Sequence, residues 1–364
     1  MADERAVATV ALAAVSGNCA RLRSALTGGA RLCAVVKADA YGHGAAECAR
    51  AALDGGATSL AVATAREAAV LREGGISART LVMGALTRAE IAIALEAEAD
   101  VVAWTPEFLR SLPRGARVHV KLDTGMGRLG ARDPRDAVAL ADALAERDGV
   151  ELAGLMTHFA TADEVGDEHF PAQLDRFARF VHELRVRHPG VPAHAANSAA
   201  TLRDPGAHFD MVRCGVAVYG LDPFQRDPRE HGLQPALELR SYVASVRRLE
   251  TGDGAGYGRR FVASRPTWLA TLPIGYADGW RRALTNNCDV LLHGRRHPLV
   301  GTVSMDNIAV DLGANTDIRA GDEAVLVGVQ GDERITAEEV AGRLDTINYE
   351  VACGIGPRVP RRYR

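Results

Sequence analysis

Short apolar segments alternate with helical segments between residues 31 and 220, and this alternation limits the possible folds more than any other feature of the sequence. The apolar segments, each of strand length, are residues 31–36, 59–63, 80–84, 100–104, 116–122, 151–157, 192–196 and 209–213. Most are separated by amphipathic or alanine-rich helical segments, for example 65–73, 134–145 and 173–187. A doubly wound open sheet shares the alternation, but eight strands are the number in a (β/α)8 barrel, which we therefore predict.

The pattern changes after about residue 233 to short strand candidates separated by glycine and aspartate turns. These candidates are residues 236–249, 267–272, 290–292, 300–303, 307–311 and 323–329, and only 336–343 looks helical. We predict a second, mainly β domain. The polar segment 222–234, which holds two prolines, is the expected joint. The predicted organisation is an N-terminal strand within residues 1–11 that associates with the β domain, a barrel over 12–233 and the β domain over 234–364.

The composition gives no sign of a nucleic-acid or membrane partner. The chain has 47% hydrophobic and 24% charged residues and a net charge of −3, as in ordinary soluble proteins. An apolar run at Ala6–Val15 precedes Cys19, but Asp3 and Glu4 stand where a secretion signal carries positive charge, and the run is too short to cross a bilayer. The six cysteines have no metal-binding or CxxC spacing, so we expect reduced thiols, no metal and a cytoplasmic location.

The first candidate for chemistry is Lys37, which ends the apolar run Leu32–Val36. Burying an unpaired ammonium group is costly. Desolvation lowers the pKa of a lysine and leaves a free amine that can attack a carbonyl, as a Schiff-base lysine must. The alternative is an ordinary strand end whose lysine reaches solvent. Tyr41 and His43 follow in a glycine-containing turn, so this turn is rich in polar donors.

The segment Lys121–Gly130 (KLDTGMGRLG) carries glycines in GxGxxG spacing. The spacing alone is weak support for a dinucleotide site, and the next strand ends at His158, where an acidic residue for a ribose is expected. The other interpretation is that the glycines let the backbone pass close to a ligand while Arg128 points its guanidinium at it. His158 gains weight because it would share the barrel rim with Lys37 and Arg128.

Two more candidate segments, Asn197–Thr201 and Arg213–Val216, follow strands seven and eight. Loops at these places are the usual phosphate site of a (β/α)8 barrel. The Ser198 hydroxyl and free amides at the start of a short helix suit a phosphate, and Gly215 lets further amides approach. A simple helix cap at Asn197 would look the same in the sequence.

The predicted β domain contains Tyr257 within the glycine-rich stretch Gly252–Gly258. Its neighbours cannot bury it, so we expect the tyrosine to project from a loop. Met305-Asp306 and Asn348-Tyr349-Glu350 are further polar interruptions, although each could be an ordinary turn.

Together these motifs resemble the alanine racemases, pyridoxal-phosphate enzymes that combine a (β/α)8 barrel with a C-terminal β domain. The resemblance extends from Val35–Gly44 (VVKADAYGHG) through Leu272–Gly279 (LPIGYADG) to Ile347–Glu350 (INYE). It implies an enzyme that interconverts L-alanine and D-alanine and supplies D-alanine for peptidoglycan. It also implies a homodimer in which the barrel of one subunit and the β domain of the other share each active site.

The resemblance implies roles for individual residues as well. Lys37 would hold pyridoxal 5′-phosphate as an internal aldimine and act as one catalytic base, and Tyr257 from the partner chain would be the other. The implied cofactor-binding residues are Lys37, Tyr41, His158, Asn197, Ser198, Arg213, Gly215, Val216 and Tyr349. The implied substrate-binding residues are Arg128, Tyr276, Met305 and Asp306. Lys121 matches the position that is carbamylated in many members of the family, where the new negative charge would hold Arg128.

Two bases are also what racemisation requires, because a proton must leave one face of Cα and return to the other. By resemblance, Lys37 handles the proton of D-alanine and Tyr257 that of L-alanine, with a cationic His158–Arg213 chain behind the tyrosine. Arg213 would face the pyridine nitrogen and leave it unprotonated, because arginine hardly deprotonates.

Other functions on the same scaffold are alternatives. A racemase of serine, lysine or another amino acid would differ in pocket details that the sequence does not show. A decarboxylase would be larger and would lack this pair of bases. A non-catalytic pyridoxal-phosphate-binding protein would lack the β domain and Tyr257.

Overall fold

Two compact units make up the part of the protein that the computed structural model describes, residues 4–364. One unit holds the described residues up to Leu12 together with Gln225–Asp227 and Pro235–Arg364. The other holds Ala13–Phe224 and Pro228–Gln234. The unit boundaries in the middle of the chain therefore fall within the polar segment 222–234. No helix in residues 4–364 has the length and apolar character needed to cross a membrane.

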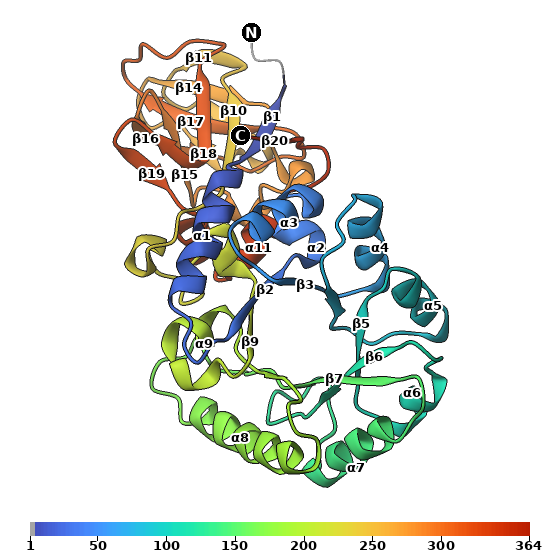
Figure 1. Ribbon diagram of the computed structural model, residues 1–364. Coiled ribbons are helices and arrows are strands. Elements are labelled where there is room, and N and C mark those ends of the chain that lie inside the picture. The colour runs from blue at the N-terminus through green and yellow to red at the C-terminus, as the bar shows by residue number, and fades with distance from the viewer. Residues whose placement is uncertain (1–3) are drawn as a thin grey trace. The chain divides into compact units, whose positions relative to one another are not determined.

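The larger unit is a closed barrel of parallel strands with helices around it (Figure 1). Its strands are β2 (Arg31–Val35), β3 (Ser59–Val62), β4 (Thr80–Val82), β5 (Asp100–Ala103), β6 (Arg117–Lys121), β7 (Glu151–Met156), β8 (Ala193–His194) and β9 (Met211–Cys214). Its helices are α1 (Leu12–Ser24), α2 (Lys37–Gly42), α3 (Ala45–Asp54), α4 (Ala65–Glu73), α5 (Arg88–Glu96), α6 (Pro106–Ser111), α7 (Pro134–Ala145), α8 (His169–Arg187) and α9 (Ser198–Arg203). Short 3-10 turns are Pro205–Ala207, Val216–Tyr219 and Pro228–His231. All eight predicted barrel strands are present, and the predicted fold class is confirmed.

The last barrel strand lies later in the chain than predicted. Phe209 has a left-handed φ of 48°, which interrupts the extended backbone, and β9 begins only at Met211. Arg213 therefore lies inside β9 and not, as expected, in the loop that follows it.

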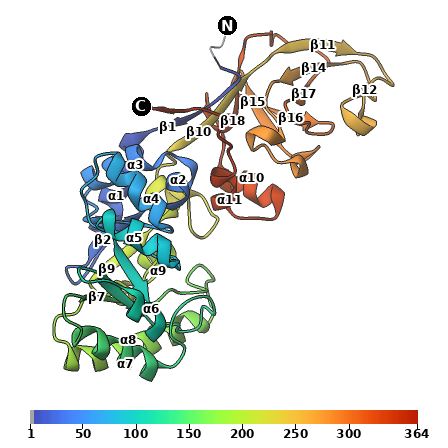
Figure 2. The same ribbon diagram turned by 90° about the vertical axis from the view of Figure 1, so that its right-hand side faces the viewer.

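The smaller unit is built on a sheet with the strand order β11-β14-β17-β16-β15-β18-β10-β1-β20, and β19 pairs with β18. Its strands are β1 (Ala6–Val10), β10 (Leu237–Tyr242), β11 (Ser245–Leu249), β14 (Thr267–Leu272), β15 (Asp289–Leu292), β16 (Arg295–Val300), β17 (Ile308–Gly313), β18 (Glu323–Gln330), β19 (Glu333–Ile335) and β20 (Arg361–Tyr363). The remaining elements are the pair β12 (Gly254–Ala255) and β13 (Phe261–Val262), the helices α10 (Ala337–Leu344) and α11 (Asn348–Cys353), and the 3-10 turns Tyr257–Arg259, Tyr276–Asp278 and Arg282–Leu284. The predicted mainly β character is confirmed, and Figure 2 shows the long strands with α10 and α11.

Three details of this unit differ from the prediction. The single strand expected over 236–249 is divided into β10 and β11. The strand expected over 300–303 instead ends at Val300, because Gly301 has a φ of 74°. The third difference is α11, where only a polar turn was expected. Its N-cap residue, Ile347, provides no capping side chain, so the usual sequence signal for a helix start is missing.

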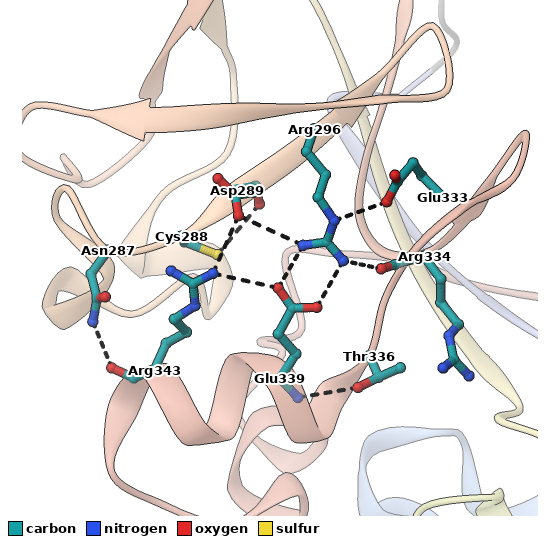
Figure 3. Close-up of polar contacts among 9 residues, drawn as sticks. All are labelled: Asn287, Cys288, Asp289, Arg296, Glu333, Arg334, Thr336, Glu339 and Arg343. Atoms are coloured by element: carbon teal, nitrogen blue, oxygen red, sulfur yellow. Dashed lines mark hydrogen bonds and ion pairs between the residues drawn. The ribbon is translucent and has the colours of Figure 1, made fainter. Parts of the chain in front are cut away.

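A cluster of ion pairs joins α10 to the β15–β16 hairpin (Figure 3). Arg296 of β16 makes two bonds to the Glu339 carboxylate of α10, at 2.6 and 2.9 Å. Arg343 of α10 bonds Asp289 of β15 at 3.3 Å. The paired, forked geometry of arginine and carboxylate fixes orientation as well as distance. The cluster thus holds α10 in place just before α11, the helix that carries Tyr349.

Candidate active site

Lys37 lies just beyond the carboxyl end of β2, at the rim of the barrel. β2 pairs in parallel with β9, so that Cys33 lies opposite Arg213 and Ala34 opposite Cys214. The residues after β9 are therefore next to Lys37 on the rim. Active sites of (β/α)8 barrels form at this end of the strands.

The four residues after Lys37 form an unusual left-handed turn, with φ between 52° and 55° from Ala38 to Tyr41. None of them is glycine, and each such residue costs about 1–2 kcal/mol relative to the right-handed conformation. Strain of this kind persists only where surrounding bonds fix the backbone, and it is concentrated at functional sites. The turn brings the Tyr41 ring centroid to 5.9 Å from the Lys37 Nζ.

Glu67 of α4 holds this turn from the neighbouring strand–helix loop. Its Oε1 accepts a hydrogen bond from the Ala38 amide at 2.7 Å. Its Oε2 accepts from the amides of Ala63 at 2.8 Å and Thr64 at 3.0 Å, as part of the capping box of α4. One carboxylate therefore satisfies three backbone donors and joins the loop after β2 to the loop after β3.

We expect Glu67→Ala to lower the free energy of unfolding by about 1–3 kcal/mol, because three backbone donors, one of them part-buried, lose their common acceptor. Amide exchange at Ala38 should also become faster. The matched control is Glu90→Ala: Glu90 caps α5 with Thr87 in the same way but, within residues 4–364, bonds only inside its own capping box. Equal losses in the two variants, with unchanged exchange at Ala38, would contradict this role of Glu67.

Hydroxyl and amide groups gather where α9 and the 3-10 turn after β9 begin. Ser198 Oγ accepts from the amides of Gly215 at 3.0 Å and Ala217 at 3.3 Å. The Tyr41 hydroxyl lies so close to Gly215 that a β-carbon there would be 2.3 Å from it. Two hydroxyls and the amides of helix starts form a group suited to a phosphate. Asn197 caps α9 through its side chain, the simpler of its two predicted roles.

Arg213 is 2% exposed and reaches across two neighbouring strands. Its Nη1 bonds His194 Nδ1 at 2.8 Å, and its Nη2 donates to the carbonyls of Thr157 at 2.8 Å and Ala195 at 3.0 Å. Nη2 also donates to His158 Nδ1 at 3.1 Å. Burial lowers the pKa of Arg213 to about 10. Its Nε is buried and has no hydrogen-bond partner in the described part of the chain, so this N–H suits an acceptor atom on a ligand.

The geometry shows that His158 is neutral. Because a guanidinium only donates, His158 Nδ1 is the acceptor from Arg213, and the ring proton lies on Nε2. Burial, together with the cations of Arg213 and Arg128, holds the pKa of His158 well below its usual range. The expected cationic His158–Arg213 chain is therefore wrong in one respect, since Arg213 alone carries the charge.

Lys121 is the last residue of β6 and is 3% exposed. Burial and the cations of Arg213 and Arg128 lower the pKa of Lys121 to about 8. Arg128 itself is exposed, in the loop that follows β6. The pKa of His158 is lowered by four nearby cations, those of Lys37, Lys121, Arg128 and Arg213. The structure therefore brings these predicted residues together at one end of the barrel.

The glycine-rich loop after β6 turns around the carboxylate of Asp123. The amides of Gly125, Met126 and Gly127 donate to this carboxylate at 2.8–3.1 Å. The following helix, α7, begins only at Pro134. A dinucleotide site needs amides that are open to a pyrophosphate at the start of a helix. The dinucleotide interpretation of the GxGxxG spacing is therefore wrong, because the loop uses these donors internally.

The remaining predicted residues belong to the β unit, and most of them lie on loops that contact one another there. Thr302 Oγ1 donates to the carbonyl of Tyr257 at 2.7 Å, and the Tyr276 amide donates to the carbonyl of Ser304 at 3.0 Å, beside Met305. Tyr257 is 74% exposed, Met305 51% and Tyr276 40%. Three large side chains on connected loops are thus left exposed.

Asp306 and Tyr349 complete the predicted set. Asp306 Oδ1 accepts from Arg358 Nη2 at 2.8 Å. Tyr349 is the second residue of α11. His194, which bonds Arg213, was not predicted, although a histidine inside the apolar segment 192–196 was a visible signal. Glu67 was not predicted either, because its capping box does not reveal that it also holds Ala38.

Comparisons with known proteins agree over both units. The family model described as the N-terminal domain of alanine racemase matches residues 10–223, and the model of the C-terminal domain matches residues 236–363. An alanine racemase of Symbiobacterium thermophilum is 45% identical, over 98% of this chain and 96% of that protein. One of Geobacillus stearothermophilus is 41% identical, over 97% of this chain and 92% of that protein.

Solved structures give the same result. The crystal structure of alanine racemase from E. faecalis superposes with a TM-score of 0.93 at 36% identity and covers 99% of this chain and 98% of that one. The alanine racemase of Streptomyces coelicolor A3(2) gives a TM-score of 0.92 at 38% identity, covering 98% and 97%.

Proposed function

We propose a function for this chain from one premise: the chain belongs to the alanine racemase family. It interconverts L-alanine and D-alanine, in the cytoplasm, and so supplies D-alanine for peptidoglycan. The observation that carries the proposal is the position of Lys37, which a strained left-handed turn joins to Tyr41. The Lys37 Nζ lies 5.9 Å from the Tyr41 ring centroid, and the Tyr41 hydroxyl lies against Gly215, whose amide donates to Ser198 Oγ. Strain and convergent donors at one barrel rim are the marks of a built site and not of an ordinary strand end.

Pyridoxal 5′-phosphate is the proposed cofactor, and the residues present fit it. Lys37 provides an amine for its aldehyde, and the Tyr41 and Ser198 hydroxyls with the amides of Gly215 and Val216 provide partners for its phosphate. The buried Nε of Arg213, without a partner in residues 4–364, provides a donor for its ring nitrogen.

The other proposed cofactor residues act around these. Asn197 supports Ser198 by capping α9, His158 supports Arg213, and Tyr349 adds a further hydroxyl for the phosphate. When bound, the cofactor withdraws electrons from an attached amino acid and makes its Cα hydrogen acidic.

The chain's own residues then have distinct tasks. Lys37 and Tyr257 exchange protons with the two faces of the substrate Cα. Arg213 keeps its own proton and so leaves the ring nitrogen unprotonated. Arg128, with the Met305 amide, Tyr276 and Asp306, surrounds the substrate and meets its carboxylate.

Lys121 is proposed to be carbamylated by carbon dioxide. Only a neutral amine can react, and a pKa of about 8 leaves a useful neutral fraction near pH 7. Because this fraction grows as the pH rises through about 8, carbamate formation should increase between about pH 7 and 9. The new anion would lie among cations and attract Arg128.

We expect a carbamate carbonyl signal in the 13C NMR spectrum of protein equilibrated with 13C-bicarbonate, stronger at about pH 9 than at about pH 7. The signal should be missing in Lys121→Met. A spectrum without that signal across this pH range, or one that Lys121→Met retains, would show that Lys121 is not carbamylated.

We also propose that the active form is a homodimer in which the β unit of each subunit completes the active site of its partner. The support is that three large side chains, those of Tyr257, Met305 and Tyr276, lie exposed on connected loops. Surfaces of this kind commonly mark an interface between protein chains.

Mixing two inactive variants tests this sharing. After subunit exchange between Lys37→Ala and Tyr257→Ala, half of the dimers are hybrids, and each hybrid has one intact site if the sites are shared. We expect recovery of about a quarter of the native activity, as a two-fold symmetric dimer requires. Confirmed exchange without any recovery would mean that both bases come from the same chain.

The test of the function itself is a racemisation assay on both enantiomers of alanine beside serine, lysine and arginine, with added pyridoxal 5′-phosphate. Alanine should be the best substrate in both directions. A clear preference for another amino acid would assign a different racemase, and tight cofactor binding without turnover would assign a non-catalytic binding protein.

A further inference from the structure

Four buried side chains from four strands form a continuous hydrogen-bonded path through the barrel. Arg213 Nη1 bonds His194 Nδ1 at 2.8 Å, and His194 Nε2 bonds His119 Nδ1 at 2.8 Å. His119 Nε2 bonds Asp100 Oδ2 at 3.3 Å. The four residues, in β9, β8, β6 and β5, are all between 1% and 6% exposed. The interior of a (β/α)8 barrel is usually filled by branched apolar side chains, so this polar path is a departure that needs a reason.

The path has a fixed direction that follows from the geometry alone. Arg213 can only donate, so His194 Nδ1 is an acceptor and the His194 proton lies on Nε2. His194 therefore donates to His119 Nδ1, and the His119 proton must lie on Nε2, where it is donated to Asp100. Both imidazoles are neutral, and every donor points from Arg213 toward the carboxylate.

Gly154 shows that the path is built into the barrel. It lies in β7, between the strands that carry the two histidines, and their bond must pass over it. A β-carbon at this position would be only 2.4 Å from His119 Nδ1. A glycine inside a strand costs stability and often marks a close approach by another group. Here that group is the imidazole of His119.

The far end of the path is anchored at the other mouth of the barrel. Asp100 Oδ1 accepts from Arg117 Nε at 3.0 Å, and Arg79 Nη1 lies 3.5 Å from Oδ2. These residues line a cavity of about 460 Å³, most of whose lining residues stand at or near the starts of the barrel strands. The path thus runs from the amino-terminal mouth to Arg213. Within residues 4–364 no carboxylate bonds Arg213 directly, and Asp100 is the anion that the path reaches.

We propose that Asp100 is a positioning residue for Arg213. Through His119 and His194, it fixes one edge of the guanidinium, so that Nε keeps a single orientation in the active site. A carboxylate that holds a histidine in one tautomer is an established device for aiming a catalytic group. The path orients Arg213 and does not move protons, because arginine hardly deprotonates. The kinetic part of this inference rests on the proposed racemase function, whereas the tautomers do not.

The first test measures the tautomers by 15N NMR of the purified full chain labelled at histidine. We expect both His119 and His194 to carry a proton on Nε2 alone, and a hydrogen-bond coupling between their rings. In Gly154→Ala the added methyl group should separate the rings and remove this coupling. Gly17→Ala is the matched control, because a β-carbon at Gly17 meets no atom within 4 Å. A proton on Nδ1 of either ring in the native protein would overturn the proposal.

The second test is kinetic. In Gly154→Ala and in Asp100→Leu, kcat for alanine should fall about tenfold, the usual order for a supporting contact, with little change in KM. Gly17→Ala should keep native values. Gly154→Ala keeps the Asp100 ion pairs, so it tests the path even if Asp100→Leu does not fold. Native kcat in a folded Gly154→Ala that has lost the coupling would overturn the proposal. An inactive native protein with the expected tautomers would instead contradict the racemase function.

Discussion

Replacing Tyr257 with phenylalanine is expected to lower the rate of alanine racemisation by about 10²–10⁴-fold, the usual worth of a positioned proton transfer. The substitution removes the hydroxyl and keeps the ring. Because Tyr257 is 74% exposed, the packing of the β unit should survive. Both directions must slow by the same factor at low substrate concentration, since an enzyme cannot change the equilibrium between enantiomers. The overall rate therefore cannot show which face Tyr257 serves.

Exchange of the Cα hydrogen in deuterium oxide distinguishes the two faces. With Tyr257→Phe, D-alanine should still exchange its hydrogen through Lys37 and largely keep its configuration. L-alanine should exchange far more slowly, because the base on its face is missing. Tyr242→Phe, a tyrosine of β10, is the matched control and should behave as the native protein. Equal exchange of both enantiomers in Tyr257→Phe would mean that one base serves both faces.

The barrel could be predicted from the sequence because its strands are buried on both faces and therefore appear as continuous apolar segments. Lys37 stood out for the same reason, as a charge at the end of such a segment. The left-handed turn from Ala38 to Tyr41 could not be predicted. Left-handed backbone is normally signalled by glycine, and these four residues have none. Contacts distant in sequence, such as that from Glu67, impose it instead.

The inner path of the barrel shows a second limit of sequence reasoning. His119 and His194 are 75 positions apart, and only closure of the barrel brings their rings to 2.8 Å. Arg213 was predicted as a site residue but was expected in a loop. The reason is that β9 begins only after Phe209, whose left-handed backbone has no signal in the sequence. The proposed catalytic pairing of Lys37 with Tyr257 came from the family resemblance, since the residues alone indicated only an exposed tyrosine in a glycine-rich loop.

Replacing Arg213 with methionine should have the second large effect, a loss of about 3–5 kcal/mol in the free energy of unfolding. The guanidinium makes four hydrogen bonds, to His194, His158 and the carbonyls of Thr157 and Ala195. Methionine leaves these buried acceptors without their donor, at about 1–3 kcal/mol each when no water replaces it. The variant also no longer has to desolvate a buried cation, and this gain offsets part of the cost. The expected net loss is therefore smaller than the summed cost of the four acceptors.

The loss should be local to the barrel. Hydrogen exchange should become faster in peptides covering β7, β8 and β9, whereas β18 in the other unit provides an internal reference within the same sample. Arg179→Met is the matched control, because Arg179 is 70% exposed and pairs with Asp175 on the surface of α8, where such pairs contribute about 0–1 kcal/mol. Arg213→Lys should recover only part of the stability, because one compact ammonium group cannot reach all four acceptors at the ends of β7 and β8. The contrary result would be that Arg213→Met unfolds at the same urea midpoint as the native protein and that its amides in β7 to β9 exchange at the native rate. The buried guanidinium would then not be what stabilises this end of the barrel. Its hydrogen bonds to His158 and His194 would then have to be explained by catalysis alone.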